Sequence, residues 1–268
     1  MKTDQELKQQ HRAARQAHRK STQNHSITAG NSAVIDCACV IHSNKYDWTY
    51  VERLYNMVNR HSEVKVNFHV YTEHDRSVPP HMIKHCLEDW PGVSGPKKSW
   101  WYKLHMFNPE HHAGPLLYFD LDCVILRDIT WIARLGTDRF WSLRDFKYLQ
   151  SDVINKVNSS VMWWDTRKFN YVWDKFNQAD VHKTVRQYHG DQDFIEATVA
   201  YQDRRYLEDR YFQSYRWQVA DGGMDFRTKH PKYPGTGSNI SGDCAVIVFH
   251  GDPKPHNVTD PQIVTLWC

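Results

Sequence analysis

The sequence predicts an α/β fold, a three-layer sandwich in which helices cover a mostly parallel central sheet. Residues 33–41 form an apolar run rich in β-branched side chains, which is typical of a buried strand. Residues 51–58 carry apolar side chains at helical spacing, and residues 64–70 alternate apolar and polar side chains as a strand does. A strand, a helix and a second strand in this order indicate two parallel strands joined by a crossover helix.

The rest of the chain continues this alternation of strands and helices. Further strands are expected at residues 116–119, 140–143, 157–164 and 245–249, and further helices at residues 100–107, 169–176 and 191–199. In folds with a parallel sheet, ligands bind beyond the carboxyl ends of the strands. Polar residues that directly follow a predicted strand are therefore the first candidates for a functional site.

Length and charge indicate one folded domain after a basic tail. A chain of 268 residues, 40% of them hydrophobic, can bury one sizeable core, which we assign to residues 31–268. Residues 1–30 hold six Lys or Arg, two acidic residues and almost no large apolar side chains, so we expect a disordered basic tail, with an interaction arm as the alternative. The remaining 28 basic and 29 acidic residues nearly balance, which argues against a nucleic-acid partner.

Hydropathy and cysteine usage point to a cytoplasmic protein. The sequence has no stretch long and apolar enough for a transmembrane segment, and its N-terminus lacks the apolar core of a signal peptide. The six cysteines form no C-x-x-C pair, and three of them lie within apolar runs. We interpret them as small core side chains in a reducing compartment, and neither as a disulfide framework nor as a zinc site.

The acidic turn Asp120-Leu121-Asp122 directly follows the predicted strand 116–119. Two carboxylates separated by one residue can converge on a hard divalent cation, because such ions prefer oxygen ligands. The pattern itself is uninformative, since a chain with this many Asp residues contains D-x-D about twice by chance. It occurs here at 120/122 and at 191/193. The position at a strand end is what favours a metal site at the first of the two.

The same turn fits a second class of enzyme. Residues 119–125 look like the first motif of haloacid-dehalogenase-type phosphohydrolases, in which one Asp is the nucleophile and the next an acid or base. That motif usually opens its fold, whereas this one lies more than a hundred residues into the chain. It also has Gly where this sequence has Cys123. A phosphohydrolase is therefore the alternative reading.

Together with the acidic turn, five segments resemble motifs of the retaining GT-A glycosyltransferases of family 8, which include glycogenin and bacterial lipopolysaccharide galactosyltransferases. These segments are SNKY at 43–46, YKLHMF at 102–107, NSSV at 158–161, GDQDF at 190–194 and VFHGDPKPH at 248–256. The resemblance implies a Rossmann-like GT-A sandwich that takes a hexose from a nucleotide-sugar, UDP-glucose or UDP-galactose. It also implies a glycan or other hydroxyl acceptor, and Mn²⁺ or Mg²⁺ as cofactor.

Several residues take donor-binding roles by this resemblance. Tyr46 would stack on uracil, or else simply pack on the following helix. Lys103 would contact donor phosphate or sugar, or else be an exposed helical lysine. The remaining donor-binding positions are Asp120, Leu121, Asn158, Gly251 and Lys254. Ser160 stands where the family has a Gly, which alters the close approach of backbone to donor expected there.

The resemblance also implies a metal site and a reaction centre. Asp120, Asp122 and His250 would hold the cation. Asp191 and Gln192 would lie beneath the sugar, although an Asp at the start of a helix is also explained as an N-cap. In the family two residues commonly separate the His from the Gly, and a Trp stands at the position of His256.

Retention is compatible with a glycosyl-enzyme or with attack from the leaving-group face. A GT-A module that binds nucleotide-sugar or glycan without turnover is a further alternative.

Overall fold

The computed structural model describes residues 34–90, 92–93, 98–149, 155–220 and 239–268. The basic tail expected at residues 1–30 lies outside the described residues, so it stays a prediction. Among the described residues, no helix is long and apolar enough to cross a membrane.

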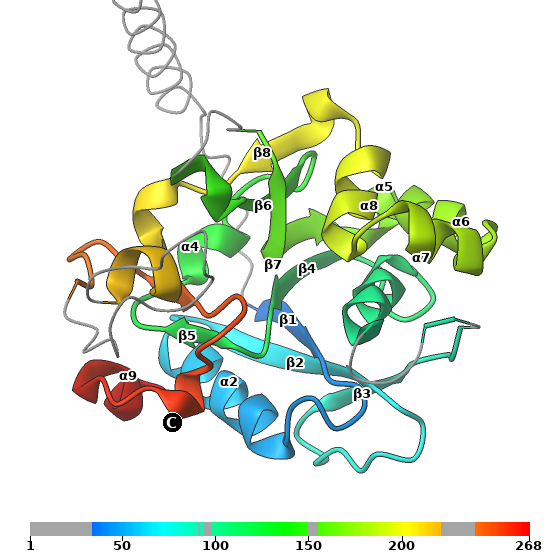
Figure 1. The fold of residues 1–268 in the computed structure, drawn as a ribbon. Coiled ribbons are helices and arrows are strands. Elements are labelled where there is room, and N and C mark those ends of the chain that lie inside the picture. The colour runs from blue at the N-terminus through cyan, green and yellow to red at the C-terminus, as the bar shows by residue number, and fades with distance from the viewer. Residues whose placement is uncertain (1–33, 91, 94–97, 150–154, 221–238) are drawn as a thin grey trace, which may run out of the picture.

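A seven-stranded sheet forms the middle of the molecule, with strand order β3-β2-β1-β4-β7-β6-β8 (Figure 1). Its strands are β1 Val34–Val40, β2 Lys65–Thr72, β3 Ile83–Cys86, β4 Pro115–Phe119, β6 Phe140–Arg144, β7 Val157–Asp165 and β8 Arg204–Tyr206. All neighbours pair in parallel except at β7, which is antiparallel to both β4 and β6. The predicted α/β fold with a mostly parallel sheet is therefore confirmed.

Helix α2 (Trp48–Arg60) covers one face of this sheet and completes the predicted β-α-β opening. It begins after Asp47, whose side chain accepts a hydrogen bond from the Thr49 backbone N–H and so satisfies one of the free donors at the helix start. Its buried residues Val51 and Leu54 belong to the same core as Cys37 of β1. The apolar side chains at helical spacing are thus those that face the sheet.

The other face is covered by a second group of short helices. These are η1 Ser99–Phe107, α5 Thr166–Phe169, α6 Tyr171–Asn177, α7 Val181–Gln187 and α8 Asp191–Thr198. The segment expected to be helical at 100–107 is a 3-10 helix. Neighbouring residues of β7 point to opposite faces, as a strand requires, because Trp163 lies in the core with α2 and Trp164 in the core under η1.

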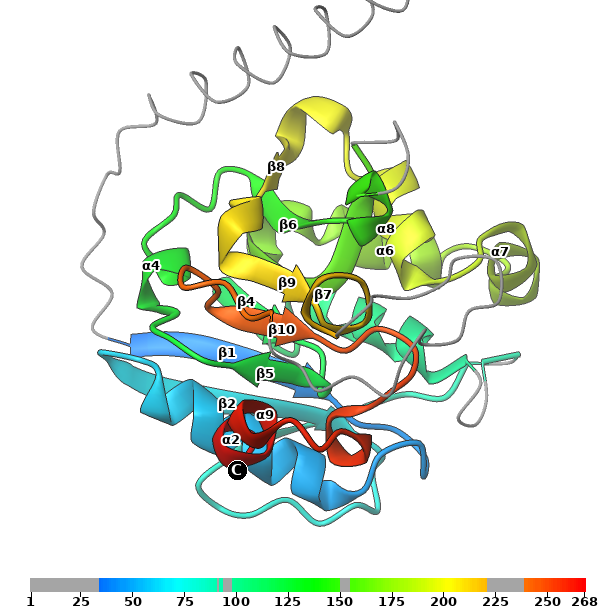
Figure 2. The same ribbon diagram turned by 60° about the vertical axis from the view of Figure 1, so that its left-hand side comes forward.

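A smaller three-stranded sheet, β5-β10-β9, lies beside the central one (Figure 2). It consists of β5 Cys123–Ile125, β9 Phe212–Ser214 and β10 Val246–Val248. The strand expected at 245–249 therefore exists but lies outside the central sheet. It pairs antiparallel with β5, the strand that directly follows the acidic turn, and the Phe249 N–H bonds the Asp122 carbonyl at 3.2 Å. This pairing carries the C-terminal loop to the turn.

The remaining elements are short and connect these layers. They are α4 Thr130–Ala133, η2 Phe146–Leu149, η3 Tyr201–Asp203, η4 Asp209–Tyr211, η5 Tyr215–Val219, η6 Pro255–Asn257 and α9 Pro261–Leu266. All six cysteines are free thiols, as expected, but only four are buried in the core, namely Cys37, Cys39, Cys123 and Cys244.

Candidate functional site

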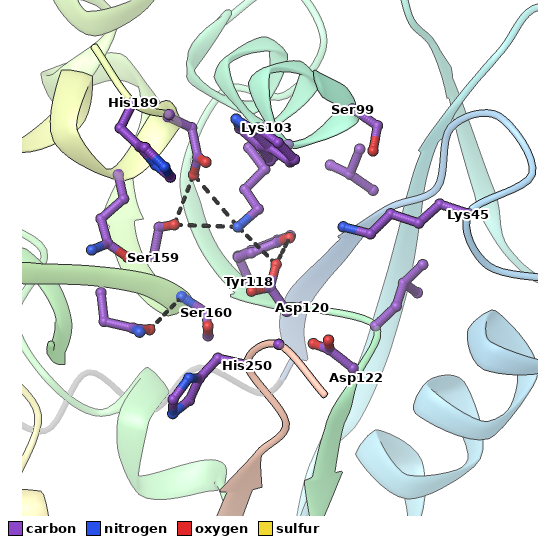
Figure 3. A pocket seen from close by; sticks show the side chains of 18 of the residues that line it. Lys45, Ser99, Lys103, Tyr118, Asp120, Asp122, Ser159, Ser160, His189 and His250 are labelled. Atoms are coloured by element: carbon purple, nitrogen blue, oxygen red, sulfur yellow. Dashed lines mark hydrogen bonds and ion pairs between the residues drawn. The ribbon is translucent and has the colours of Figure 1, made fainter. Parts of the chain in front are cut away.

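A cavity of about 630 Å³ opens beyond the carboxyl end of β4 (Figure 3). Its walls come from the loop after β1, from η1, from the acidic turn, from the start of β7, from the start of α8 and from the C-terminal loop. Because β7 is antiparallel to β4, its amino end lies at this same edge. The residues predicted for the site all line this cavity: Tyr46, Lys103, Asp120, Leu121, Asp122, Asn158, Asp191, Gln192, His250, Gly251 and Lys254.

Asp120 is the first residue after β4, and its carboxylate is held by two donors. Its Oδ1 accepts a hydrogen bond from the Tyr118 hydroxyl at 2.5 Å and lies 2.8 Å from the Lys103 Nζ. Its backbone N–H donates to the Ser160 carbonyl of β7 at 2.8 Å, which fixes the turn to the sheet. Burial raises the pKa of Asp120, but the nearby ammonium and these hydrogen bonds outweigh it and hold that pKa below its ordinary value.

Lys103 is a buried lysine at the centre of the site, with only 8% of its surface exposed. Its Nζ lies 2.8 Å from Asp120 and 3.4 Å from Asp191, and it donates to the Ser159 hydroxyl at 3.2 Å. Burial lowers the pKa of Lys103, yet the two carboxylates raise it above its ordinary value. The alternative of an exposed helical lysine is therefore wrong, and the side chain is a charged bridge between Asp120 and Asp191. Figure 3 shows Lys103 beside Asp120 and Ser159.

Asp191 begins α8 but does not cap it. The N-cap position is Gly190, and no side chain caps this helix. The Asp191 carboxylate instead accepts a hydrogen bond from Ser159 at 2.7 Å and pairs with Lys103. Burial raises the pKa of Asp191 above its ordinary value, and the negative charge of Asp120 adds to this, although Lys103 and Ser159 oppose it. The next residue, Gln192, is oriented by a 3.0 Å hydrogen bond from its side-chain amide to Asp145.

Asp122 lies in a separate group of side chains on the other side of the turn. Its Oδ2 accepts a 2.8 Å hydrogen bond from the Tyr46 hydroxyl and forms an ion pair with Lys254. The Tyr46 ring also packs on Tyr50 of α2, with ring centroids 4.7 Å apart. Both sequence interpretations of Tyr46 are therefore compatible with its position, because the same ring packs on the helix and lines the cavity.

His250 lines the cavity with its ring packed flat on Phe146, at 5.4 Å between centroids and 12° between planes. Its Nε2 lies 2.6 Å from the Ser214 hydroxyl. Burial and nearby positive charges lower the pKa of His250 to about 3, so the imidazole is neutral at pH 7, as a metal ligand must be. Gly251 follows at φ +74°, and a Cβ there would collide with the Arg216 guanidinium. Only glycine fits this position without strain.

The three predicted metal ligands share the cavity but do not converge on one point. Asp120 contacts Lys103, Asp122 contacts Lys254 and His250 contacts Ser214. In the part of the chain that the structure describes, their ligating atoms do not all come within 4.8 Å of one another. Two carboxylates and a neutral imidazole nevertheless form a donor set that suits Mn²⁺. The ammonium groups of the two lysines supply the positive charge that these carboxylates would otherwise receive from a cation.

Three further residues belong to this site and were not singled out from the sequence. Tyr118 and Ser159 donate to the two central carboxylates, and Asp145 orients Gln192. Tyr118 was recognisable in principle, because residues two apart on a strand point to the same face and Asp120 follows two residues later. Asp145 follows strand β6 as Asp120 follows β4, so the strand-end rule would have identified it too. Ser159 carried no signal of its own.

Solved glycosyltransferases share this fold. The galactosyltransferase LgtC, solved with donor and acceptor sugar analogues, superposes with a TM-score of 0.60 at 14% identity, covering 87% of this chain and 95% of that one. The bifunctional glycosyltransferase WbbM gives 0.58 at 12% identity, covering 91% of this chain and 51% of that one. GlyE of Streptococcus pneumoniae TIGR4 gives 0.57 at 14% identity, covering 87% and 59%.

At these identities the similarity shows the fold, and it confirms the expected GT-A architecture and the structural resemblance to family 8 enzymes. No protein-family model and no curated protein sequence matches the chain. The motif of the phosphohydrolase alternative usually opens its fold, whereas here the acidic turn follows the fourth strand of the central sheet in chain order.

Proposed function

We propose that this protein is a metal-dependent retaining glycosyltransferase that moves a hexose from a UDP-sugar, UDP-glucose or UDP-galactose, to an acceptor hydroxyl. The observation that carries the proposal is the buried Asp120-Lys103-Asp191 array at the carboxyl end of the sheet. It places a permanent positive charge between two carboxylates inside a cavity large enough for a small ligand. The GT-A fold supports the same conclusion.

The chemistry that the residues supply is stabilisation of a leaving diphosphate. Breaking the bond between the sugar and the diphosphate builds up negative charge, and preorganised positive groups lower that barrier. Lys45, Lys103 and Lys254 all line the cavity and provide such charge. A divalent ion held by Asp120, Asp122 and His250 would act as a Lewis acid on the same diphosphate. Tyr46 would offer its ring to the uracil base.

Asp191 is the residue that we assign to the face of the sugar opposite the leaving group. The residue is 4% exposed and its carboxylate is held by Ser159 and Lys103, so its orientation is set before any substrate binds. There it would stabilise positive charge at the anomeric carbon, a role common to double displacement and to attack from the leaving-group face. The Gln192 amide, oriented by Asp145, would bind the sugar or its diphosphate.

The experiment combines donor turnover with nucleotide binding. The full-length protein is incubated with UDP-glucose or UDP-galactose and Mn²⁺, and released UDP is measured alongside calorimetric titration with UDP. We expect slow donor hydrolysis, which Asp191→Asn should abolish. We also expect Mn²⁺-dependent UDP binding, which Asp122→Asn should abolish. If neither donor is cleaved and UDP does not bind, the proposal fails. UDP binding without cleavage of either donor would instead indicate a non-catalytic binding module.

A further inference from the structure

A second cluster of ligating side chains lies away from this cavity, toward the amino ends of β1 and β4. It consists of Asp36 on β1, His69 on β2 and His112, three residues before β4 begins. One ligating atom from each lies within 4.8 Å of the other two. The His69 Nε2 is 3.0 Å from the Asp36 Oδ1, and the rings of the two histidines lie 4.9 Å apart. None of the three lines the cavity at the carboxyl end of β4.

Neighbouring groups orient each of these side chains. The His112 Nε2 lies 3.1 Å from the Pro115 carbonyl, and a carbonyl only accepts, so the proton is assigned to Nε2 and a lone pair stays on Nδ1. The Asn67 amide donates to Asp36 Oδ1 at 3.0 Å. His69 Nδ1 lies 2.8 Å from the Nε2 of His85. Contacts of this kind fix the ring orientations and tautomers of metal-binding histidines.

We propose that Asp36, His69 and His112 bind a divalent transition-metal ion, and that this ion is Zn²⁺. Two imidazoles and one carboxylate are a donor set that zinc accepts, with water in the fourth position. The Asp36 side chain is 30% exposed, so water and the ion can reach it. This site is distinct from the metal position proposed for the transferase reaction, and it does not depend on that function.

The hydrogen-bond network can adapt to the ion without losing a proton. In the free protein the Asp36 carboxylate accepts, so we assign the proton of His69 to Nε2, and its Nδ1 then accepts from the Nε2 of His85. With the ion on Nε2, the single proton of His69 sits on Nδ1 and is donated to the Nε2 of His85, whose own proton moves to its Nδ1. With these tautomers each ring carries one proton in both arrangements, and the His69 nitrogen that meets the ion is unprotonated, as a zinc ligand must be.

Binding at this place would stabilise the folded chain. The ion would join two neighbouring strands, β1 and β2, to the turn that precedes β4, and these segments lie far apart in the sequence. A ligand that binds the folded state and not the unfolded chain raises the melting temperature as its concentration rises. The structure therefore assigns the site a stabilising role.

The test measures metal content and does not require activity. Full-length wild type, His112→Ala, Asp36→Asn and the control His74→Ala are dialysed against low-micromolar Zn²⁺, and bound zinc is determined by mass spectrometry. His74 is exposed and lies outside the cluster. We expect wild type and the control to hold one more equivalent of zinc than either cluster variant. Ions bound elsewhere on the chain are common to all four proteins and cancel in the difference.

Two further readouts keep the proposal falsifiable. Co²⁺ substitution should give visible absorption bands of a four-coordinate ion in wild type and in His74→Ala only, and Zn²⁺ should raise the melting temperature of these two proteins only. Asp36→Asn retains the size of the side chain and an oxygen that can accept a hydrogen bond from His69. Its zinc content therefore tests the proposal even if His112→Ala fails to fold. Equal zinc content in all four proteins would overturn the proposal.

Discussion

The two ends of strand β4 carry polar clusters of opposite character. At the carboxyl end, carboxylates are held by ammonium groups, as in the pairs Asp120-Lys103 and Asp122-Lys254. At the amino end, Asp36 accepts hydrogen bonds from the His69 imidazole and the Asn67 amide. The first arrangement combines negative and positive groups and suits an anionic ligand accompanied by a cation. Among the described residues no lysine or arginine forms an ion pair with Asp36, so the second arrangement presents its lone pairs to a metal ion alone. Charge compensation therefore distinguishes two sites built on the same strands.

The largest expected effect separates these two ends. Asp122→Asn removes the carboxylate that is proposed to hold the cation, and we expect turnover of a UDP-sugar to fall by about 100-fold or more, with loss of Mn²⁺-dependent UDP binding. Calorimetry and donor hydrolysis measure both quantities. The exposed Asp243→Asn serves as the control. Zinc content at the other end should not change, and wild-type UDP affinity in Asp122→Asn would contradict the proposed site.

The second prediction concerns stability. Lys103→Met removes the ammonium that pairs with both Asp120 and Asp191, and we expect the free energy of unfolding to fall by about 3 kcal/mol, as when one partner of a buried pair is removed. Urea unfolding at pH 7 measures the loss. Adding Asp191→Asn to this variant should restore part of it, since one of the two uncompensated charges is then gone. Lys65→Met, at an exposed lysine, is the control. Equal stability of wild type and Lys103→Met would show that Lys103 does not stabilise the charged forms of Asp120 and Asp191.

A smaller effect appears as a pH dependence in metal-free buffer. The pKa of His250 is lowered to about 3 in the folded protein, below its ordinary value of about 6.5. The folded state therefore binds this proton less readily than the unfolded chain. The contribution of His250 to the free energy of unfolding is fully present above pH 6.5 and is lost as pH falls from there towards 3. We expect the free energy of unfolding of His250→Asn to fall by about 2 kcal/mol less than that of wild type between pH 7 and pH 5. Parallel curves for the two proteins would refute a buried neutral His250, and His74→Asn controls for exposed histidines.

The smallest expected effect concerns the nucleotide base. Tyr46→Ala removes the ring that lines the cavity and should weaken UDP binding about fivefold, which corresponds to about 1 kcal/mol of stacking. Tyr46→Phe removes only the hydroxyl that donates to Asp122 and should retain most of the affinity. Titration calorimetry with UDP distinguishes the two. If the Phe variant is weakened as much as the Ala variant, Tyr46 acts through Asp122 and not through stacking.

Much of the fold was predictable because the spacing of apolar side chains along the chain indicates which face of a helix or strand is buried. The alternation at residues 64–70 and the helical spacing at 51–58 correspond to β2 and α2. Strand partners were less predictable. Nothing local in residues 245–249 indicates that β10 pairs with β5 and lies outside the central sheet, because that depends on a contact between segments more than a hundred residues apart.

For the site, the sequence by itself determined which residue types are available and that polar groups follow buried strands, and with the motif resemblance this identified part of the cavity wall. Only the tertiary structure decided their partners. Lys103 became a buried bridge, Asp191 turned into the site instead of capping its helix, and His250 was held by Ser214. The physical reason is that burial and charge compensation arise from neighbours in space. The Asp36, His69 and His112 cluster has the same origin, because three separate segments contribute one ligand each.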